Sequence, residues 1–114
     1  MSLSYNITDK MMQEITDAIV REVDPERIVL FGSRARGDAA QDSGVDLLII
    51  ERGPFGIGRS RRNELTKVER ALIRFAVPTD ILLYNMEEVE HWRGSLNHVI
   101  GRALREGKVI YERP

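Results

Sequence analysis

The spacing of apolar residues along the chain predicts a series of helices and short strands. Between Thr8 and Val23 apolar positions recur every three or four residues, which is typical of an amphipathic helix capped by Thr8 or Asp9. Uninterrupted short apolar runs are instead typical of buried strands. The expected strands are 27–31, 45–50, 79–84 and 109–111, and the later helices are expected to begin at Ser60, at Asn85 and at Ser95, the last with Leu96 in its buried stripe.

Two connecting segments stand out by composition. Residues 32–44 join the first two expected strands and form a Gly- and Arg-containing loop, and residues 51–58 hold three glycines and a proline. The second segment is expected to be a mobile loop, placed where a lid over a site could sit. The order of elements predicts one α+β domain over residues 1–114, with a small mixed sheet and helices packed on one face.

The amino-acid composition and net charge exclude several classes of protein and several kinds of site. The 114 residues are 42% hydrophobic, and 17 basic against 18 acidic side chains give a formal net charge of −1. This charge provides no general attraction to nucleic acid, so direct nucleic-acid binding is not expected. The absence of cysteine excludes disulfides and thiolate zinc sites. No apolar run reaches the length of a membrane span, and a cytoplasmic location is expected.

The chemistry is concentrated around a Gly-Ser turn that follows the first strand. Gly32 permits close approach and unusual dihedral angles, and with Ser33 it offers backbone N–H groups and a hydroxyl to a phosphate. Asp46 lies at the start of the next buried strand, where an unpaired carboxylate is costly, so a metal ion or an arginine is expected beside it. Asp80 lies near the start of the third strand.

The segments FGSRARG (31–37) and SGVDLLII (43–50), with ten residues between Ser33 and Gly44, resemble the signature of minimal nucleotidyltransferase domains, which are relatives of DNA polymerase beta. The resemblance continues through 77–84 and 103–111, and is to the domains that act as antitoxins to HEPN-type toxins. It implies the nucleotidyltransferase fold, ATP as the substrate and Mg²⁺ held by Asp46 and Asp80, which would also be the catalytic residues. It assigns nucleotide binding to Gly32, Ser33, Arg34 and Arg36.

The family signature has an Asp-x-Asp pair, and in this chain its first Asp is replaced by Gly44. Three explanations remain open. In the first, Asp42, which shares the strand parity of Asp46, folds inward and replaces the missing carboxylate. In the second, the domain has lost catalysis and retains binding, and in the third, residue 44 has been altered from the natural one. Arg34 and Arg36 likewise have two interpretations, as phosphate ligands or as solvated loop charges.

The resemblance implies transfer of AMP from Mg-ATP to a protein acceptor such as a HEPN-type toxin, with the domain acting as its antitoxin. The alternative is a catalytically degenerate module that binds nucleotide or only contacts its partner. Trp92, between two short helices, is either an anchor for that partner or a core residue. The sequence leaves open whether the chain forms homo-oligomers.

Overall fold

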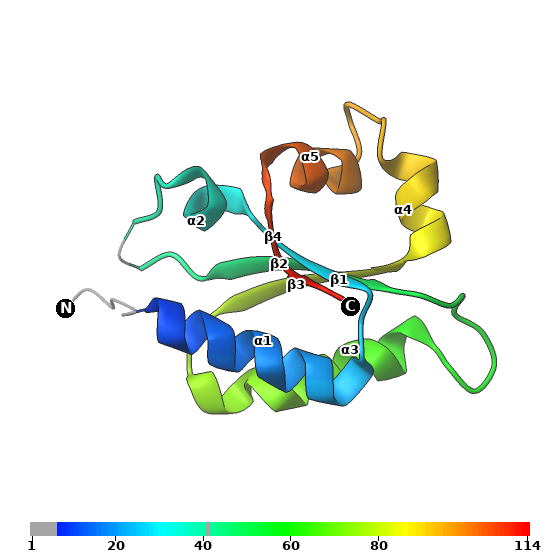
Figure 1. Ribbon diagram of the computed structural model, residues 1–114, viewed down its shortest axis with the longest axis horizontal. Coiled ribbons are helices and arrows are strands. Elements are labelled where there is room, and N and C mark those ends of the chain that lie inside the picture. Colours follow the sequence, from blue (N-terminus) through cyan, green and yellow to red (C-terminus); the bar gives the residue numbers. More distant parts are fainter. Residues whose placement is uncertain (1–6, 41) are drawn as a thin grey trace.

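The structure is a computed structural model that describes residues 7–40 and 42–114, so residues 1–6 of the predicted domain and Gln41 lie outside the described residues. A four-stranded mixed sheet is arranged in the order β3-β2-β1-β4 (Figure 1). β2 pairs with β1 in antiparallel and with β3 in parallel orientation, and β4 pairs with β1 in antiparallel orientation. The strands are β1 (Arg27–Phe31), β2 (Val45–Glu51), β3 (Thr79–Asn85) and β4 (Lys108–Glu112).

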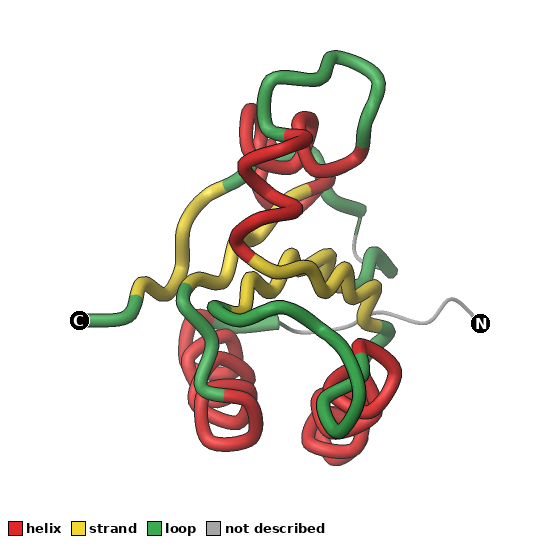
Figure 2. The backbone as a smooth tube through the Cα atoms, turned by 90° about the vertical axis from the view of Figure 1, so that its right-hand side faces the viewer, coloured by secondary structure: helices red, strands yellow, loops and turns green. Residues whose placement is uncertain are grey.

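The predicted small mixed sheet in an α+β domain is confirmed, but the helices cover both faces of the sheet and not one (Figure 2). α1 and α3 pack on one face, and the shorter α2, α4 and α5 lie on the other. The helices are α1 (Asp9–Val23), α2 (Gly32–Arg36), α3 (Arg61–Leu72), α4 (Met86–Trp92) and α5 (Val99–Glu106), with a 3₁₀ turn at Ile73–Phe75.

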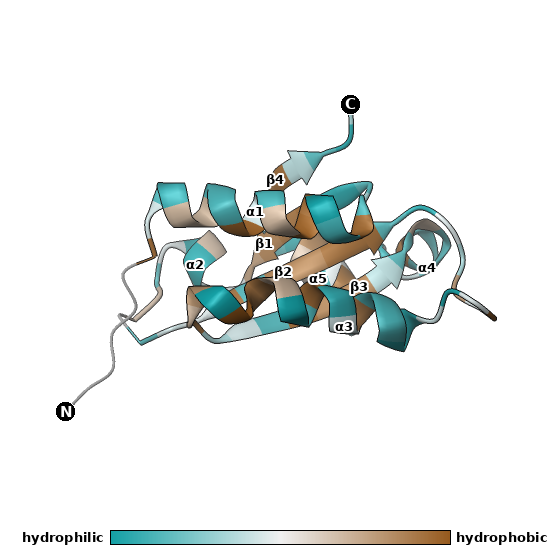
Figure 3. Cartoon of the chain, turned by 90° about the horizontal axis from the view of Figure 1, so that it is seen from below, coloured by the Kyte–Doolittle hydropathy of each residue, from teal (hydrophilic) through white to brown (hydrophobic). Residues whose placement is uncertain are grey.

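The apolar run in β2 explains why both faces are covered. Successive side chains of a strand point to opposite faces, so a continuous apolar run needs a cover on each side. Leu47 and Ile49 belong to the core cluster under α1 and α3, whereas Leu48 and Ile50 belong to the cluster under α4 and α5. In Figure 3, which colours the chain by hydropathy, β1 and β2 are largely brown, whereas α1 and α3 carry many teal residues.

Side-chain caps begin four of the helices. Thr8 accepts a hydrogen bond from the Met11 N–H and Ser60 from the Asn63 N–H, as the sequence predicts. Asn85 and Glu88 form a capping box at α4. The fourth cap differs from the prediction, since His98 Nδ1 accepts from the Ile100 N–H at α5.

The predicted Ser95 cap is therefore wrong, and so is the predicted burial of Leu96, which is 75% exposed. Arg105 donates to the carbonyl oxygens of Ser95 and Leu96, which holds this segment as a loop along α5. Trp92 is not a core residue, because it is 38% exposed, and it stacks on the His98 ring at 4.2 Å. Its role as an anchor for a partner stays a prediction.

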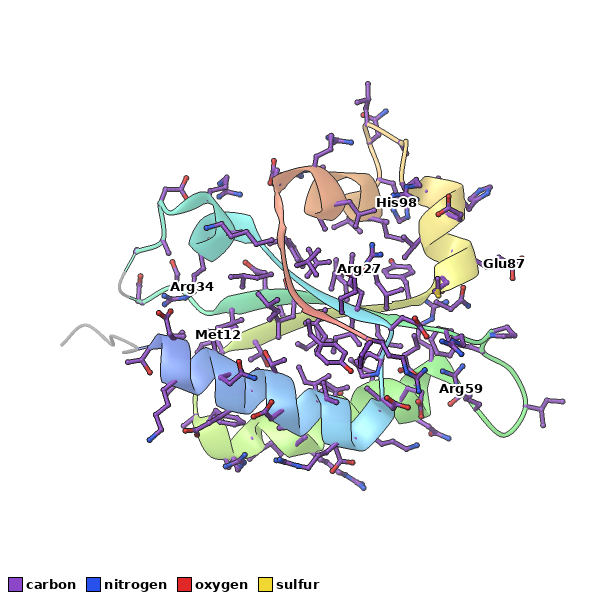
Figure 4. All side chains as sticks on the ribbon, viewed as in Figure 1. Met12, Arg27, Arg34, Arg59, Glu87 and His98 are labelled. Atoms are coloured by element: carbon purple, nitrogen blue, oxygen red, sulfur yellow. The ribbon has the colours of Figure 1, made fainter. Side chains whose placement is uncertain are left out.

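The two connecting segments also differ from expectation. The predicted loop 32–44 begins with a short helix, α2, which ends where Gly37 takes a left-handed conformation (φ 82°). The predicted lid follows the C-terminal end of β2, whereas Asp46 lies at its N-terminal end. Figure 4 places Arg34 and Arg59 at opposite ends of the sheet, so the lid interpretation is wrong.

Within 7–40 and 42–114, no helix has the length and apolar content needed to cross a membrane.

A buried carboxylate ends β2 at the side away from Asp46. Glu51 is 1% exposed and pairs with the Arg59 guanidinium at 2.5 Å, while its Oε2 atom has no hydrogen-bond partner among the described residues. Burial and the neighbouring Glu64 together outweigh Arg59 and raise the pKa of Glu51 to about 7. Near neutral pH the Glu51 carboxyl is therefore partly protonated, which lowers the cost of burying it.

We expect the protein to lose stability as pH rises from about 5 to 8. The folded protein binds more protons than the unfolded chain between the ordinary Glu51 pKa of 4.5 and the folded value of about 7, so the free energy of unfolding falls across this window. The expected loss is roughly 1–3 kcal/mol, measured by thermal unfolding at a series of pH values.

Glu51→Gln mimics the protonated side chain and should flatten this dependence, whereas the control Glu69→Gln, at an exposed position of α3, should retain it. Equal pH dependence in the unaltered protein and Glu51→Gln would contradict the assignment of this titration to Glu51.

Candidate functional site

Asp46 and Asp80 lie side by side on neighbouring strands. They are register partners in the parallel pairing of β2 with β3, and adjacent strands are about 4.8 Å apart. Both side chains share the face of the sheet that holds Leu48 and Leu82, because these residues are two positions further along each strand. The Asp46 side chain is half-buried and Asp80 is exposed. The sequence-predicted pair of carboxylates is therefore brought to one place.

Little positive charge surrounds the carboxylates of Asp46 and Asp80. Burial raises the pKa of the Asp46 carboxyl, the negative charge of Asp80 raises it further, and the guanidinium of Arg36 acts in the opposite direction. No ion pair joins Asp46 to a cation in the part of the chain that the structure describes. Two adjacent carboxylates without a directly paired cation are a donor set suited to a divalent metal ion such as Mg²⁺.

Gly32 packs directly against the Asp46 side chain. Its φ of +72° is left-handed, and a Cβ atom placed on it would lie 2.2 Å from Asp46 Oδ2 and 3.0 Å from Asp46 Cγ. Only glycine fits this position without displacing the carboxylate. The contact joins the Gly-Ser turn to the acidic pair, since Ser33 is the next residue and stands in the first turn of α2.

The N-terminus of α2 differs from those of the other helices. Its N-cap residue is Phe31, which provides no side-chain hydrogen bond to the first-turn N–H groups. The first N–H groups of a helix have no partner within the helix, and here they stand beside Gly32 and the Asp46 carboxylate. They are available to an anion.

Arg34 and Arg36, both predicted to bind nucleotide, form contacts with different partners. Arg34 donates through Nε to the Gly44 carbonyl oxygen at 2.9 Å and through Nη2 to that of Ser43, so it fastens the loop that precedes β2. Neither predicted role of Arg34 included this contact, which joins residues ten positions apart. Arg36 instead pairs with Asp38 at 3.3 Å and with Glu106 of α5 at 3.4 Å.

The position of the missing family carboxylate is closed by Pro78. A Cβ atom on Gly44 would lie 2.4 Å from the Pro78 carbonyl oxygen and 2.9 Å from Pro78 Cβ, while the Val45 N–H donates to the same oxygen at 2.9 Å. An aspartate at position 44 therefore requires the β2–β3 edge to move.

The predicted replacement by Asp42 is not supported. Asp42 is exposed, and the described residues contain no group of three His, Cys, Asp or Glu side chains that could hold a metal ion. The inward turn expected from strand parity fails because β2 begins only at Val45, so Asp42 lies in the preceding turn. The site offers two carboxylates, Asp46 and Asp80.

A cavity beside the site is lined by residues that sequence reasoning missed. A cavity of about 130 Å³ lies between α2 and α5 and is lined by Gly32, Arg36, Arg102 and Glu106 with apolar neighbours. No local motif marks the last two residues, which are about 70 positions from Arg36. A larger cavity of about 310 Å³ lies between α4 and β4, and none of the predicted site residues line it.

Comparison with known proteins identifies similar sequences and folds. The sequence model of the family described as "Nucleotidyltransferase domain" matches residues 12–110. A candidate nucleotidyltransferase from Sulfolobus solfataricus has a similar structure, with 20% identity and a TM-score of 0.57 over 91% of this chain and 79% of that one. A structure described as a toxin-antitoxin with AMP-PNP has 17% identity and a TM-score of 0.50 over 87% and 72% of the respective chains. No curated protein is significantly similar in sequence.

The contact between Gly32 and Asp46 generates a stability prediction with a matched control. Gly37 has a similar φ of +82° but no atom within 4 Å of an added Cβ, so Gly37→Ala should cost only the left-handed backbone strain of about 1–2 kcal/mol. Gly32→Ala should cost roughly 1–3 kcal/mol more, because it also displaces the Asp46 side chain. Urea unfolding measures both.

The second change Asp46→Ala in the Gly32→Ala background should recover most of this additional cost. Equal destabilisation by Gly32→Ala and Gly37→Ala would show that the Asp46 side chain does not constrain position 32.

Proposed function

Since the chain belongs to the nucleotidyltransferase domain family, we propose that it binds Mg-ATP at the Gly32–Ser33 turn and the Asp46–Asp80 pair, and transfers AMP to a protein acceptor. The observation that carries this proposal is the pairing of the two carboxylates in register, with Gly32 packed against one of them. The proposed metal-binding and phosphate-binding groups therefore meet where α2 follows β1 beside the paired strands β2 and β3.

Asp46 and Asp80 are the residues that would hold Mg²⁺. The ion supplies neutralisation of phosphate charge and activation of the attacking oxygen. The uncapped N–H groups of α2 and the Ser33 hydroxyl bind phosphate oxygens, because helix N-termini favour negative charge. Arg36 supplies positive charge from the end of α2 and acts on the Asp46 carboxyl across the same site.

The proposed reaction is a displacement at the α-phosphorus of ATP. A hydroxyl oxygen of the acceptor loses its proton to solvent and forms the new P–O bond, the bond from the α-phosphorus to the bridging oxygen of the β-phosphate breaks, and pyrophosphate leaves. The residues of this chain bind and orient the triphosphate, since positioning and electrostatic stabilisation dominate such transfers. The acceptor is an external protein, for which a HEPN-type toxin is our candidate.

A second candidate function is nucleotide binding without transfer, in an antitoxin that masks its toxin by contact. The closure of position 44 by Pro78 favours it, because the site then lacks the first carboxylate of the family signature. The similar structure described as a toxin-antitoxin with AMP-PNP supports a protein partner in both cases. We place the partner surface around Trp92 and Leu96, which are exposed beside α4 and α5.

We expect Asp46→Asn and Asp80→Asn each to weaken Mg-ATP binding by at least about tenfold in calorimetry, because each removes a negatively charged metal ligand. Asp17→Asn, on the outer side of α1, has the same change of charge and should bind as the unaltered protein does. With EDTA in place of Mg²⁺ the three variants should bind ATP alike. Equal Mg-ATP affinity in all variants would contradict the assignment of the metal ligands.

Labelled ATP distinguishes the two candidate functions. Incubation of the chain and a co-purified HEPN-type toxin with Mg²⁺ and ATP labelled at the α-phosphate should label the toxin, whereas label at the γ-phosphate should not be transferred. Asp46→Asn should abolish the transfer. Binding of Mg-ATP without any label on the toxin would favour the second candidate over the first.

A further inference from the structure

The cavity between α2 and α5 places Arg36 beside two charged residues, Arg102 and Glu106, to which the proposed reaction assigns no role. Arg36 at the end of α2 and Arg102 and Glu106 on α5 line it, together with Gly32 of the Gly-Ser turn. It therefore adjoins the proposed phosphate site directly. The 130 Å³ space is bounded by two guanidinium groups and one carboxylate.

Arg36 is held by carboxylates at the positions where it would meet a phosphate. Its Nη1 lies 3.4 Å from Glu106 Oε2 and its Nε lies 3.3 Å from Asp38 Oδ2. Both distances are at the long end for charge-assisted hydrogen bonds, and the side chains of Arg36 and Glu106 are 43% and 38% exposed. Exposed pairs of this kind are weak, so a phosphate can displace a carboxylate from Arg36.

Arg102 provides a second position for the displaced carboxylate. It lies four residues before Glu106, so the two side chains share one face of α5 and are within reach of each other. Arg102 forms no ion pair with any residue of 7–40 or 42–114. Glu106 therefore has two arginines within reach. It pairs with Arg36 of α2, whereas Arg102 on its own helix has no ion-pair partner among the described residues.

We propose that Glu106 competes with the β- and γ-phosphates of the nucleotide for Arg36, and that Arg102 takes up Glu106 when these phosphates bind. Glu106 and Arg102 are then positioning residues that set how tightly the site holds a triphosphate relative to a monophosphate. Loss of the pyrophosphate returns Glu106 to Arg36, which favours release of the product. This inference rests on the proposed function, since it concerns the phosphates of the same nucleotide.

The test is calorimetry of the full chain with Mg-ATP and with AMP. Glu106→Gln should tighten Mg-ATP binding by about two- to fivefold, the amount that an exposed ion pair contributes, and should leave AMP binding unchanged. Glu90→Gln is the matched control, because Glu90 is exposed on α4 and pairs with Arg93 outside this cavity. It should change neither affinity.

The role of Arg102 is tested in two backgrounds. Arg102→Ala alone should weaken Mg-ATP binding by about two- to fivefold, since Glu106 then stays on Arg36. The double variant Arg102→Ala/Glu106→Gln should bind as tightly as Glu106→Gln alone. Weakening by Arg102→Ala in both backgrounds would instead show direct contact of Arg102 with phosphate and overturn the exchange of Glu106 between the two arginines.

The outcomes separate this inference from the proposed function. Failure of the unaltered protein to bind Mg-ATP at millimolar concentration would overturn both. Mg-ATP binding that depends on Asp46, with identical affinities for Glu106→Gln and Glu90→Gln, would overturn only the role of Glu106. A gain in affinity for AMP equal to the gain for Mg-ATP would show a general effect of charge and would also overturn it.

Discussion

The structure depends on a strand that is buried on both faces and carries a carboxylate near each end. In β2, Val45 and Leu47–Ile50 are buried, with Asp46 near one end and Glu51 at the other. A carboxylate in such a position is costly unless it is paired or protonated. The free-energy cost of burial is offset differently for the two carboxylates. Glu51 has Arg59 in direct contact, and burial together with Glu64 raises its pKa to about 7, so it is a structural group.

The negative charge of the Asp46 carboxylate, in contrast, remains uncompensated. Burial and the negative charge of Asp80 on the same face raise the pKa of Asp46, and Arg36, which opposes this shift, is already paired with Asp38 and Glu106. Gly32 closes over the carboxylate, and the unsatisfied N–H groups at the start of α2 face the same region. Negative charge for a cation and donors for an anion thus meet at one junction, which is the arrangement that a metal-bound phosphate needs.

Much of this fold and the centre of the site could be predicted from the sequence. The strands, the Thr8 and Ser60 caps and the Asn85–Glu88 box follow from local patterns, and the adjacency of Asp46 and Asp80 follows from the family resemblance. Contacts between distant residues could not be predicted. The contacts of Arg36 with Glu106 and of Gly44 with Pro78 depend on packing that no local pattern encodes. The cover on the second face of the sheet, in contrast, follows from the continuous apolar run of β2.

We propose that Asp46 and Asp80 hold the metal ion of a bound nucleotide beside Gly32 and Ser33. Anomalous diffraction from crystals grown with Mn²⁺ and a non-hydrolysable ATP analogue tests it most directly, because Mn²⁺ replaces Mg²⁺ and is located without reference to the protein atoms. We expect a Mn²⁺ peak in contact with both carboxylates, and phosphate oxygens at the α2 N-terminus. Mn²⁺ and phosphates bound in the cavity between α4 and β4, with Asp46 and Asp80 free, would contradict it.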